Sequence, residues 1–77
     1  MMKILVLGPG CPKCELLLKN SKQAVQELGI ECEVEKITDL QVIMKYGVMM
    51  TPGLVVEGQV KSVGKVLSAE KIKEYLR

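Results

Sequence analysis

The feature that most limits what this chain can fold into is a short apolar run followed at once by a helical pattern. Residues 3–7, "KILVL", are unbroken and apolar and end at glycine, which is typical of a strand buried on both faces. From Pro12, a favoured first-turn residue, apolar side chains recur at steps of three and four until Gly29. Residues 31–36 then alternate apolar and charged side chains. Together they predict a parallel strand–helix–strand unit with a right-handed crossover.

A second, shorter helix is predicted after "TDLQ", residues 38–41. This motif has the form of a capping box, with Thr38 as the cap and Gln41 reaching back to it. We expect the inner side of this helix to carry Leu40, Ile43 and Met44, and the helix to end near residue 47.

The last third of the chain predicts a hairpin and a closing helix. Two strand-like runs flank Glu57-Gly58, the two-residue spacing of a tight turn. Ser68 is a good cap for a helix over residues 69–77, with Ile72, Tyr75 and Leu76 facing inward. The order β-α-β-α-β-β-α predicts an α/β fold with a four-stranded mixed sheet and helices on both faces.

Size and composition narrow the class of protein. With 77 residues, the chain should form one domain, residues 1–77, and its 48% hydrophobic content argues against disorder. Aromatic side chains are almost absent and the basic residues are scattered, so we expect no nucleic-acid partner. No run is long enough for a membrane span or a signal-peptide core. We therefore expect a cytoplasmic monomer with no membrane contact, where paired cysteines are more often catalytic or metal-binding than structural.

The chemistry is concentrated in "GPGCPKC", residues 8–14, between the first strand and the first helix. Cys11 would lie at the helix N-cap, where free amide groups and the macrodipole stabilise a thiolate, and Lys13 adds a cation. Cys14 lies on the buried stripe and should remain a thiol. Cys11 could then attack a disulfide, and Cys14 could resolve the mixed disulfide, with Pro12 stiffening the loop.

Two other interpretations of the cysteine pair stay open. The thiols could simply pack, although a strand-to-helix turn is not an apolar face. A closed zinc site normally needs four cysteine or histidine ligands, and this chain has three cysteines and no histidine. We predict no such metal site, but two thiolates could still bind Cu(I).

A second signal is "MMTPG", residues 49–53, in which Thr51-Pro52 directly precedes a strand-like run. Proline at this place fits the first position of a strand. It could be an ordinary loop proline, or a cis proline that presents the Thr51 backbone to an extended substrate. We expect Met49 and Met50 to line the core and the groove beside Pro52 rather than to bind copper, and Cys32 to be a small buried apolar residue.

Taken together, these residues resemble the thioredoxin-fold superfamily over nearly the whole chain. The segment Gly10-Cys11-Pro12-Lys13-Cys14 is similar to the glutaredoxin active-site loop, and Thr51-Pro52 matches the cis-proline position of the family. Val63-Gly64 before the final helix matches its closing elements. The chain looks most similar to the small archaeal and bacterial proteins called redox-active disulfide protein 2.

The resemblance implies a dithiol–disulfide oxidoreductase without a bound cofactor, working through a redox-active Cys11–Cys14 disulfide. It implies a substrate-backbone site at Thr51 and Pro52, with Gly64 at the edge of the same groove. The implied partners are disulfide-bearing proteins and a thioredoxin reductase-like flavoprotein or another thiol donor.

Three positions depart from the relatives that the chain resembles. Leu5 stands where thioredoxins carry a buried acid, and Gly10 stands where they carry a tryptophan. Lys13 replaces a tyrosine common in glutaredoxins, which favours a flavoprotein over glutathione as electron donor.

The main rival is a small copper or heavy-metal chaperone, which also has a C-x-x-C between its first strand and first helix. That fold should end in a strand, whereas this chain ends in the helical pattern "SAEKIKEYLR". A third alternative is a thioredoxin-like interaction domain that does not need both thiols.

Overall fold

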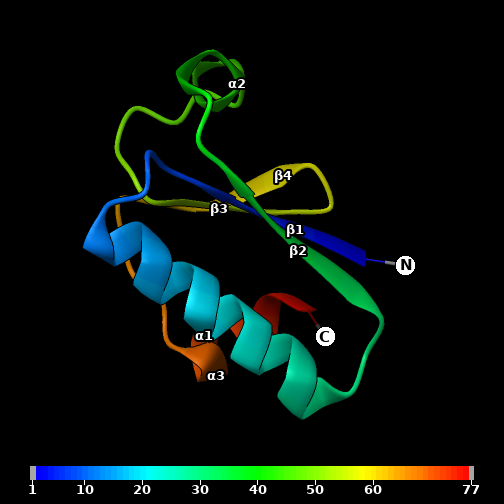
Figure 1. Cartoon of the computed structure of the whole chain (residues 1–77). Coiled ribbons are helices and arrows are strands. Elements are labelled where there is room, and N and C mark those ends of the chain that lie inside the picture. The colour runs from blue at the N-terminus through cyan, green and yellow to red at the C-terminus, as the bar shows by residue number, and fades with distance from the viewer. Residues whose placement is uncertain (1, 77) are drawn as a thin grey trace.

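The computed structural model describes residues 2–76 and has seven regular elements in the predicted order (Figure 1). Their bounds are β1 Met2–Leu7, α1 Pro12–Leu28, β2 Cys32–Ile37, α2 Leu40–Lys45, β3 Gly53–Val56, β4 Gln59–Val63 and α3 Ala69–Leu76. Within residues 2–76, no helix is both long and apolar enough to cross a membrane.

The four strands form one mixed sheet in the order β2-β1-β3-β4. β1 pairs in parallel with β2 and antiparallel with β3, and β3 pairs antiparallel with β4. β1 is therefore a central strand covered on both faces, which explains why its sequence is a continuous apolar run rather than an alternating one.

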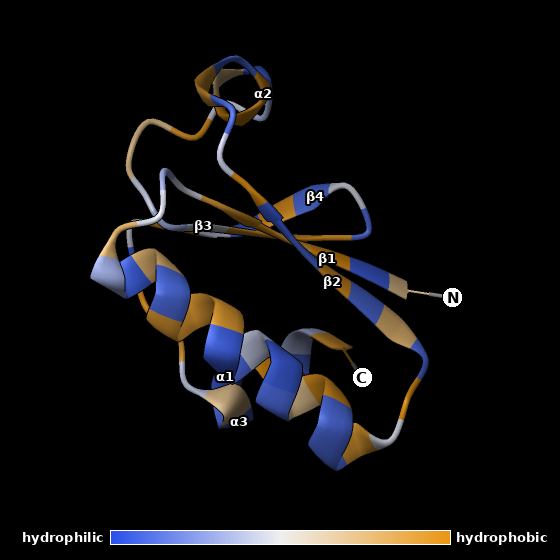
Figure 2. Ribbon diagram, in the orientation of Figure 1, coloured by the Kyte–Doolittle hydropathy of each residue, from blue (hydrophilic) through white to orange (hydrophobic). Residues whose placement is uncertain are grey.

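Each face of the sheet has its own core. On one face, Ile4 and Leu54 pack with Leu17 of α1 and Ile72 of α3, all without exposed surface. On the other face, Leu7 and Val55 pack with Ile43 of α2 and with Val48. Figure 2 shows α1 and α3 together on one side of the sheet and α2 on the other. The predicted fold, a mixed sheet with helices on both faces, is confirmed.

Local rules account for the ends of α1. Pro12 occupies its first turn, where no amide hydrogen is needed. Gly29 ends the helix in the left-handed region, with φ 64°, and its N–H donates to the carbonyls of Val25 and Gln26 at 3.1 and 3.2 Å.

Ser21, in the middle of α1, is a buried polar residue. Its hydroxyl has a hydrogen-bond partner, because it donates to the Leu17 carbonyl at 2.8 Å.

The predicted hairpin and last cap are also present. Glu57 and Gly58 have φ of 51° and 77°, the two positive values of a type I′ turn. The Ser68 hydroxyl accepts a hydrogen bond from the Lys71 N–H at 3.2 Å at the start of α3. α3 is described to Leu76, so the last residue of the predicted helix, residue 77, lies outside the described residues.

The predicted cap of α2 is wrong by one residue. Asp39, not Thr38, is the N-cap, and its carboxylate accepts a hydrogen bond from the Gln41 N–H at 2.9 Å. Aspartate and threonine are both good caps, so residue type alone does not determine which of them caps the helix; the path of the chain out of β2 does. The Gln41 side chain is exposed and does not close a capping box with Thr38.

The predicted inner face of α2 is also largely wrong. Only Ile43 is buried, while Leu40 and Met44 are 62% and 69% exposed. A helix of six residues has room for one side chain over the sheet, and the neighbouring cluster is completed by Val48 from the following loop. Met49 and Met50, predicted partly as core, are 88% and 65% exposed.

Replacing the observed cap tests this correction. We expect Asp39→Ala to lower the free energy of unfolding by about 1 kcal/mol, because the backbone N–H of Gln41 loses its hydrogen-bond acceptor. The matched control Thr38→Ala should change it by less than about 0.5 kcal/mol. Urea denaturation of the full chain measures both, and equal losses would contradict the assignment of Asp39 as cap.

Candidate active site

Three chain segments meet at one end of the sheet. Leu7 at the end of β1 pairs with Gly53 at the start of β3, and Gly53 pairs with Val63 at the end of β4. The loop after β1, the segment before β3 and the segment after β4 therefore lie together, at the left of Figure 1. This end contains all the site residues predicted from the sequence.

The two cysteines of the loop face each other. Cys11 is the N-cap residue of α1, as predicted, with extended backbone, and Cys14 is one turn further along. Their sulfur atoms are 2.7 Å apart and hydrogen-bonded, and both cysteines are free thiols. Cys11 is half-buried, whereas Cys14 is completely buried.

The surroundings shift the pKa values of the two thiols in opposite directions. The hydrogen bond from the Cys14 thiol lowers the pKa of Cys11 most, and the backbone N–H groups of Cys14 and Lys13 lower it further. Burial raises the pKa of Cys14, and the neighbouring Cys11 sulfur raises it again. The pKa of the outer sulfur is therefore lowered, which favours its thiolate, while the pKa of the inner sulfur is raised, which favours its thiol.

Gly8, which the sequence analysis did not assign to the site, lies directly behind Cys14. A Cβ at this position would overlap the Cys14 sulfur and would lie 3.7 Å from the Thr51 Cβ. Gly8 thus lets the helix approach the strand end closely and brings Cys14 beside Thr51. Its position between strand and cysteine pair was the available signal, but its contact partner comes from another part of the chain.

The predicted substrate-site residues adjoin this contact. The Thr51–Pro52 peptide bond is cis, Pro52 is buried, and its carbonyl accepts a hydrogen bond from the Gly64 N–H at 2.8 Å. Within residues 2–76, no backbone hydrogen bond involves Thr51.

The remaining loop residues point to solvent. Gly10, Pro12 and Lys13 are all exposed. Gly10 has φ 95°, a value that favours glycine, so the turn into Cys11 depends on this residue. Among the described residues, Lys13 has no ion-pair partner.

Cys32 is not part of this site. It begins β2 and pairs in register with Met2, at the opposite end of β1 from the cysteine loop. It is half-buried, and burial raises the pKa of its thiol. These observations agree with a packing role.

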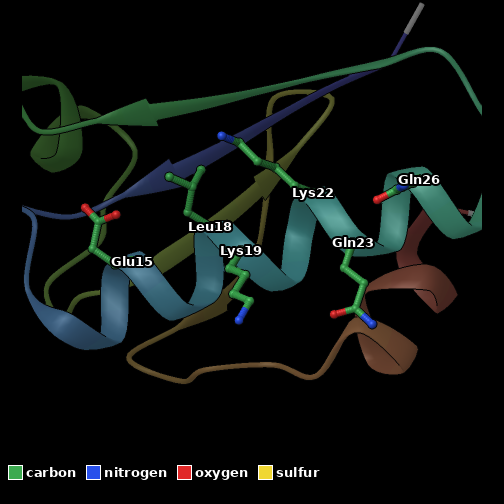
Figure 3. A pocket seen from close by; sticks show the side chains of 6 residues that line it. All are labelled: Glu15, Leu18, Lys19, Lys22, Gln23 and Gln26. Carbon is green, nitrogen blue, oxygen red and sulfur yellow. The ribbon is translucent and has the colours of Figure 1, made fainter.

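A shallow, open depression runs along α1, and neither Cys11 nor Cys14 lines it (Figure 3). Its lining consists of six α1 side chains: Glu15, Leu18, Lys19, Lys22, Gln23 and Gln26. None of these residues was predicted as a site residue, and a row of long side chains on one helix encloses no cavity. The candidate site is therefore the cysteine pair at the sheet end.

The metal-chaperone alternative finds no support. The last element among the described residues is the helix α3, not a strand. Across residues 2–76, no three cysteine, aspartate or glutamate side chains gather in an arrangement suited to a metal ion.

Comparison with known proteins assigns the family. Residues 2–77 match the thioredoxin domain family. A thioredoxin of Methanothermobacter thermautotrophicus is 47% identical over 99% of both chains. The chain belongs to the thioredoxin family. A thioredoxin of Methanocaldococcus jannaschii is 43% identical over the whole of this chain and 88% of its own length.

Membership in this family establishes the activity. Thioredoxins are thiol–disulfide oxidoreductases that use a redox-active cysteine pair and need no bound cofactor, and this chain is such an enzyme. The family implies disulfide-containing protein substrates and a reductase-type partner in general terms.

The hydrogen bond between the thiols makes a prediction about reactivity. Cys14→Ala should raise the pKa of Cys11, because it removes the largest cause of the lowering, and the alkylation of Cys11 at pH 7 should slow. Cys14→Ser keeps a hydroxyl donor and should raise this pKa less. The pH profile of iodoacetamide labelling, read by mass spectrometry, gives both values; identical profiles for the alanine variant and the parent would refute the role of the thiol.

The close approach at Gly8 gives a second prediction. Gly8→Ala should lower the free energy of unfolding by about 1–3 kcal/mol, because the new methyl group collides with the Cys14 sulfur. Gly10→Ala in the same loop meets no atom within 4 Å and should cost about 1 kcal/mol, from its positive φ alone. Thermal and urea unfolding compare the two, and an unchanged stability for Gly8→Ala would contradict the contact.

Proposed function

We propose that this protein reduces protein disulfides with Cys11 as the nucleophile and Cys14 as the resolving thiol. The observation that carries the proposal is the contact between the two sulfurs, 2.7 Å apart, with their pKa values shifted in opposite directions. Disulfide exchange needs a thiolate that can be reached by the substrate and a second thiol that reacts only afterwards. The half-buried Cys11 and the buried Cys14 meet these two needs.

In the first step, the Cys11 thiolate attacks one sulfur of the substrate disulfide. A bond forms between Cys11 and that sulfur, the substrate S–S bond breaks, and the other substrate sulfur leaves as a thiolate. The helix N-terminus and the Cys14 thiol stabilise the attacking thiolate before the step.

In the second step, Cys14 loses its proton and attacks the Cys11 sulfur. The bond between Cys11 and the substrate breaks, and a Cys11–Cys14 disulfide forms, while the substrate leaves with two reduced sulfurs. The first substrate thiolate that leaves is a base beside the site and can accept the Cys14 proton. The two electrons have then passed from the protein to its substrate.

The groove beside the pair would hold the substrate chain. Thr51 is adjacent to Cys14 through Gly8 and has a backbone without partners among the described residues. An extended segment could pair with it as an additional strand, with Pro52 and Gly64 forming the floor of the groove. This arrangement would place a substrate disulfide next to Cys11.

The cycle closes when an external donor reduces the Cys11–Cys14 disulfide. The exposed Lys13 stands between the cysteines, without the tyrosine that is common in glutaredoxins, which favours a thioredoxin reductase-like flavoprotein over glutathione. No bound cofactor enters the steps above.

Trapping the mixed disulfide tests the mechanism. Cys14→Ser, mixed with an excess of a synthetic peptide that contains one disulfide, should accumulate a covalent adduct at Cys11, because nothing can release it. The parent protein should form only free reduced peptide and its own disulfide. Mass spectrometry of acid-quenched samples distinguishes these products.

The cysteine controls decide the assignment. Cys11→Ser should form no adduct, and Cys32→Ser should behave like the parent, since Cys32 lies at the other end of β1. An adduct at Cys14 or Cys32, or none at all with Cys14→Ser, would rule out Cys11 as the nucleophile.

A further inference from the structure

The charges of the molecule are unevenly distributed around the cysteine pair. We define the active-site end as residues 8–15, 36–52 and 64–66, the segments around the ends of β1, β2 and β4 and the start of β3. Its lysines are Lys13, Lys36, Lys45 and Lys65, and its carboxylates are Glu15 and Asp39.

Both carboxylates of the active-site end are already engaged. Glu15 forms an ion pair with Lys36, with 2.7 Å between oxygen and nitrogen. Asp39 caps α2 through its hydrogen bond from Gln41. Within residues 2–76, by contrast, Lys13, Lys45 and Lys65 form no ion pair. The free charge that this end presents to solvent is positive.

The other carboxylates lie away from the cysteines. Glu57 is in the hairpin turn at the opposite end of β3, and Glu33 is near the start of β2. Glu27 and Glu70 both pair with Lys73, where α1 packs against α3. The net charge of +2 for the chain therefore arises at the active-site end, since the remaining acidic and basic residues balance.

Two exposed lysines belong to the segments that meet beside Thr51. Lys13 stands between Cys11 and Cys14 in sequence and is exposed. Lys65 is exposed and directly follows Gly64, whose N–H is bonded to the Pro52 carbonyl. A substrate segment beside Thr51 would therefore come near two lysines that form no ion pair within residues 2–76.

The surface beside Gly64 is apolar. Met50 covers Gly64, because a Cβ on that glycine would lie 3.2 Å from the Met50 Cβ and 3.4 Å from its terminal methyl. Met49 beside it is 88% exposed. Methionine is flexible and polarisable, so such a surface can adapt to different apolar side chains.

We propose that the preferred substrates carry their disulfide on an exposed, extended segment with acidic side chains near the cystine and an apolar side chain beside it. Lys13 and Lys65 attract the carboxylates, and Met49 and Met50 contact the apolar side chain. This proposal rests on the proposed function, since it describes what the Cys11 nucleophile meets. Charge complementarity of this kind acts mainly on the rate of encounter, which it can raise by about tenfold or more, and salt suppresses it.

Two synthetic disulfide peptides, identical except for glutamates or lysines flanking the cystine, test the proposal. Turnover is followed with dithiothreitol as electron donor, so that no reductase is needed, and kcat/KM is measured at low salt and at 0.5 M NaCl. We expect the acidic peptide to be preferred about tenfold at low salt and the preference to fall to nearly one at high salt.

Charge-reversal variants locate the effect. Lys65→Glu should reduce the preference for the acidic peptide several-fold through KM, with little change in kcat. The matched control Lys22→Glu, which lies in α1 outside the active-site end and is exposed, makes the same change in net charge and should leave the preference within about twofold. A spectroscopic check of folding for both variants excludes a structural cause.

The outcomes separate the two proposals. Equal kcat/KM for both peptides at low salt, or equal losses for Lys65→Glu and Lys22→Glu, would overturn the charge preference and leave the reduction mechanism standing. Failure to reduce either peptide would overturn the proposed mechanism and, with it, this inference.

Discussion

The central position of β1 is the constraint on which the rest of the structure depends. Among residues 2–76, it is the only strand that has one parallel neighbour, β2, and one antiparallel neighbour, β3. Its side chains supply both cores, Ile4 and Val6 on one face and Leu7 on the other. A shift of β1 along its neighbours would disrupt both cores, so the position of its C-terminal end is fixed. The cysteine loop leaves from that point, and the start of β3 arrives beside it, so the pairing of β1 also brings Cys14 to Thr51.

The difference between the two thiols follows from one turn of helix. Cys11 precedes α1, where unpaired amide groups favour negative charge, whereas Cys14 belongs to the stripe that packs on the sheet. No buried acid is required for this difference, since Leu5 occupies the position where thioredoxins have one and packs beside the α2-side core. The nearest carboxylate in sequence, Glu15, is bound to Lys36. The asymmetry of the pair is thus built from backbone, burial and the sulfur–sulfur contact alone.

The sequence predicted those features that depend on local rules. Element order, the N-cap position of Cys11, the stop at Gly29 and the Glu57-Gly58 turn each follow from residue type and spacing. The errors occur where neighbouring candidates compete or where the outcome depends on tertiary contacts. Thr38 and Asp39 are both good caps, and only the path out of β2 selects one. The role of Gly8 could not be predicted, because the sulfur that it must avoid belongs to Cys14, and the approach of Cys14 depends on the packing of α1 against the sheet.

Exposure of the methionines shows how selectivity can arise in so small a fold. A thiolate reacts with any disulfide that reaches it, so discrimination among substrates must come from the surface around Cys11. A chain of 77 residues has a small core that two more buried methionines would enlarge, yet Met49 and Met50 are both exposed, and Met50 lies against Gly64. Apolar side chains held in water at the rim of a reactive site are costly alone and favourable when covered. In the proposed mechanism, these exposed methionines would be the residues that a bound substrate chain covers.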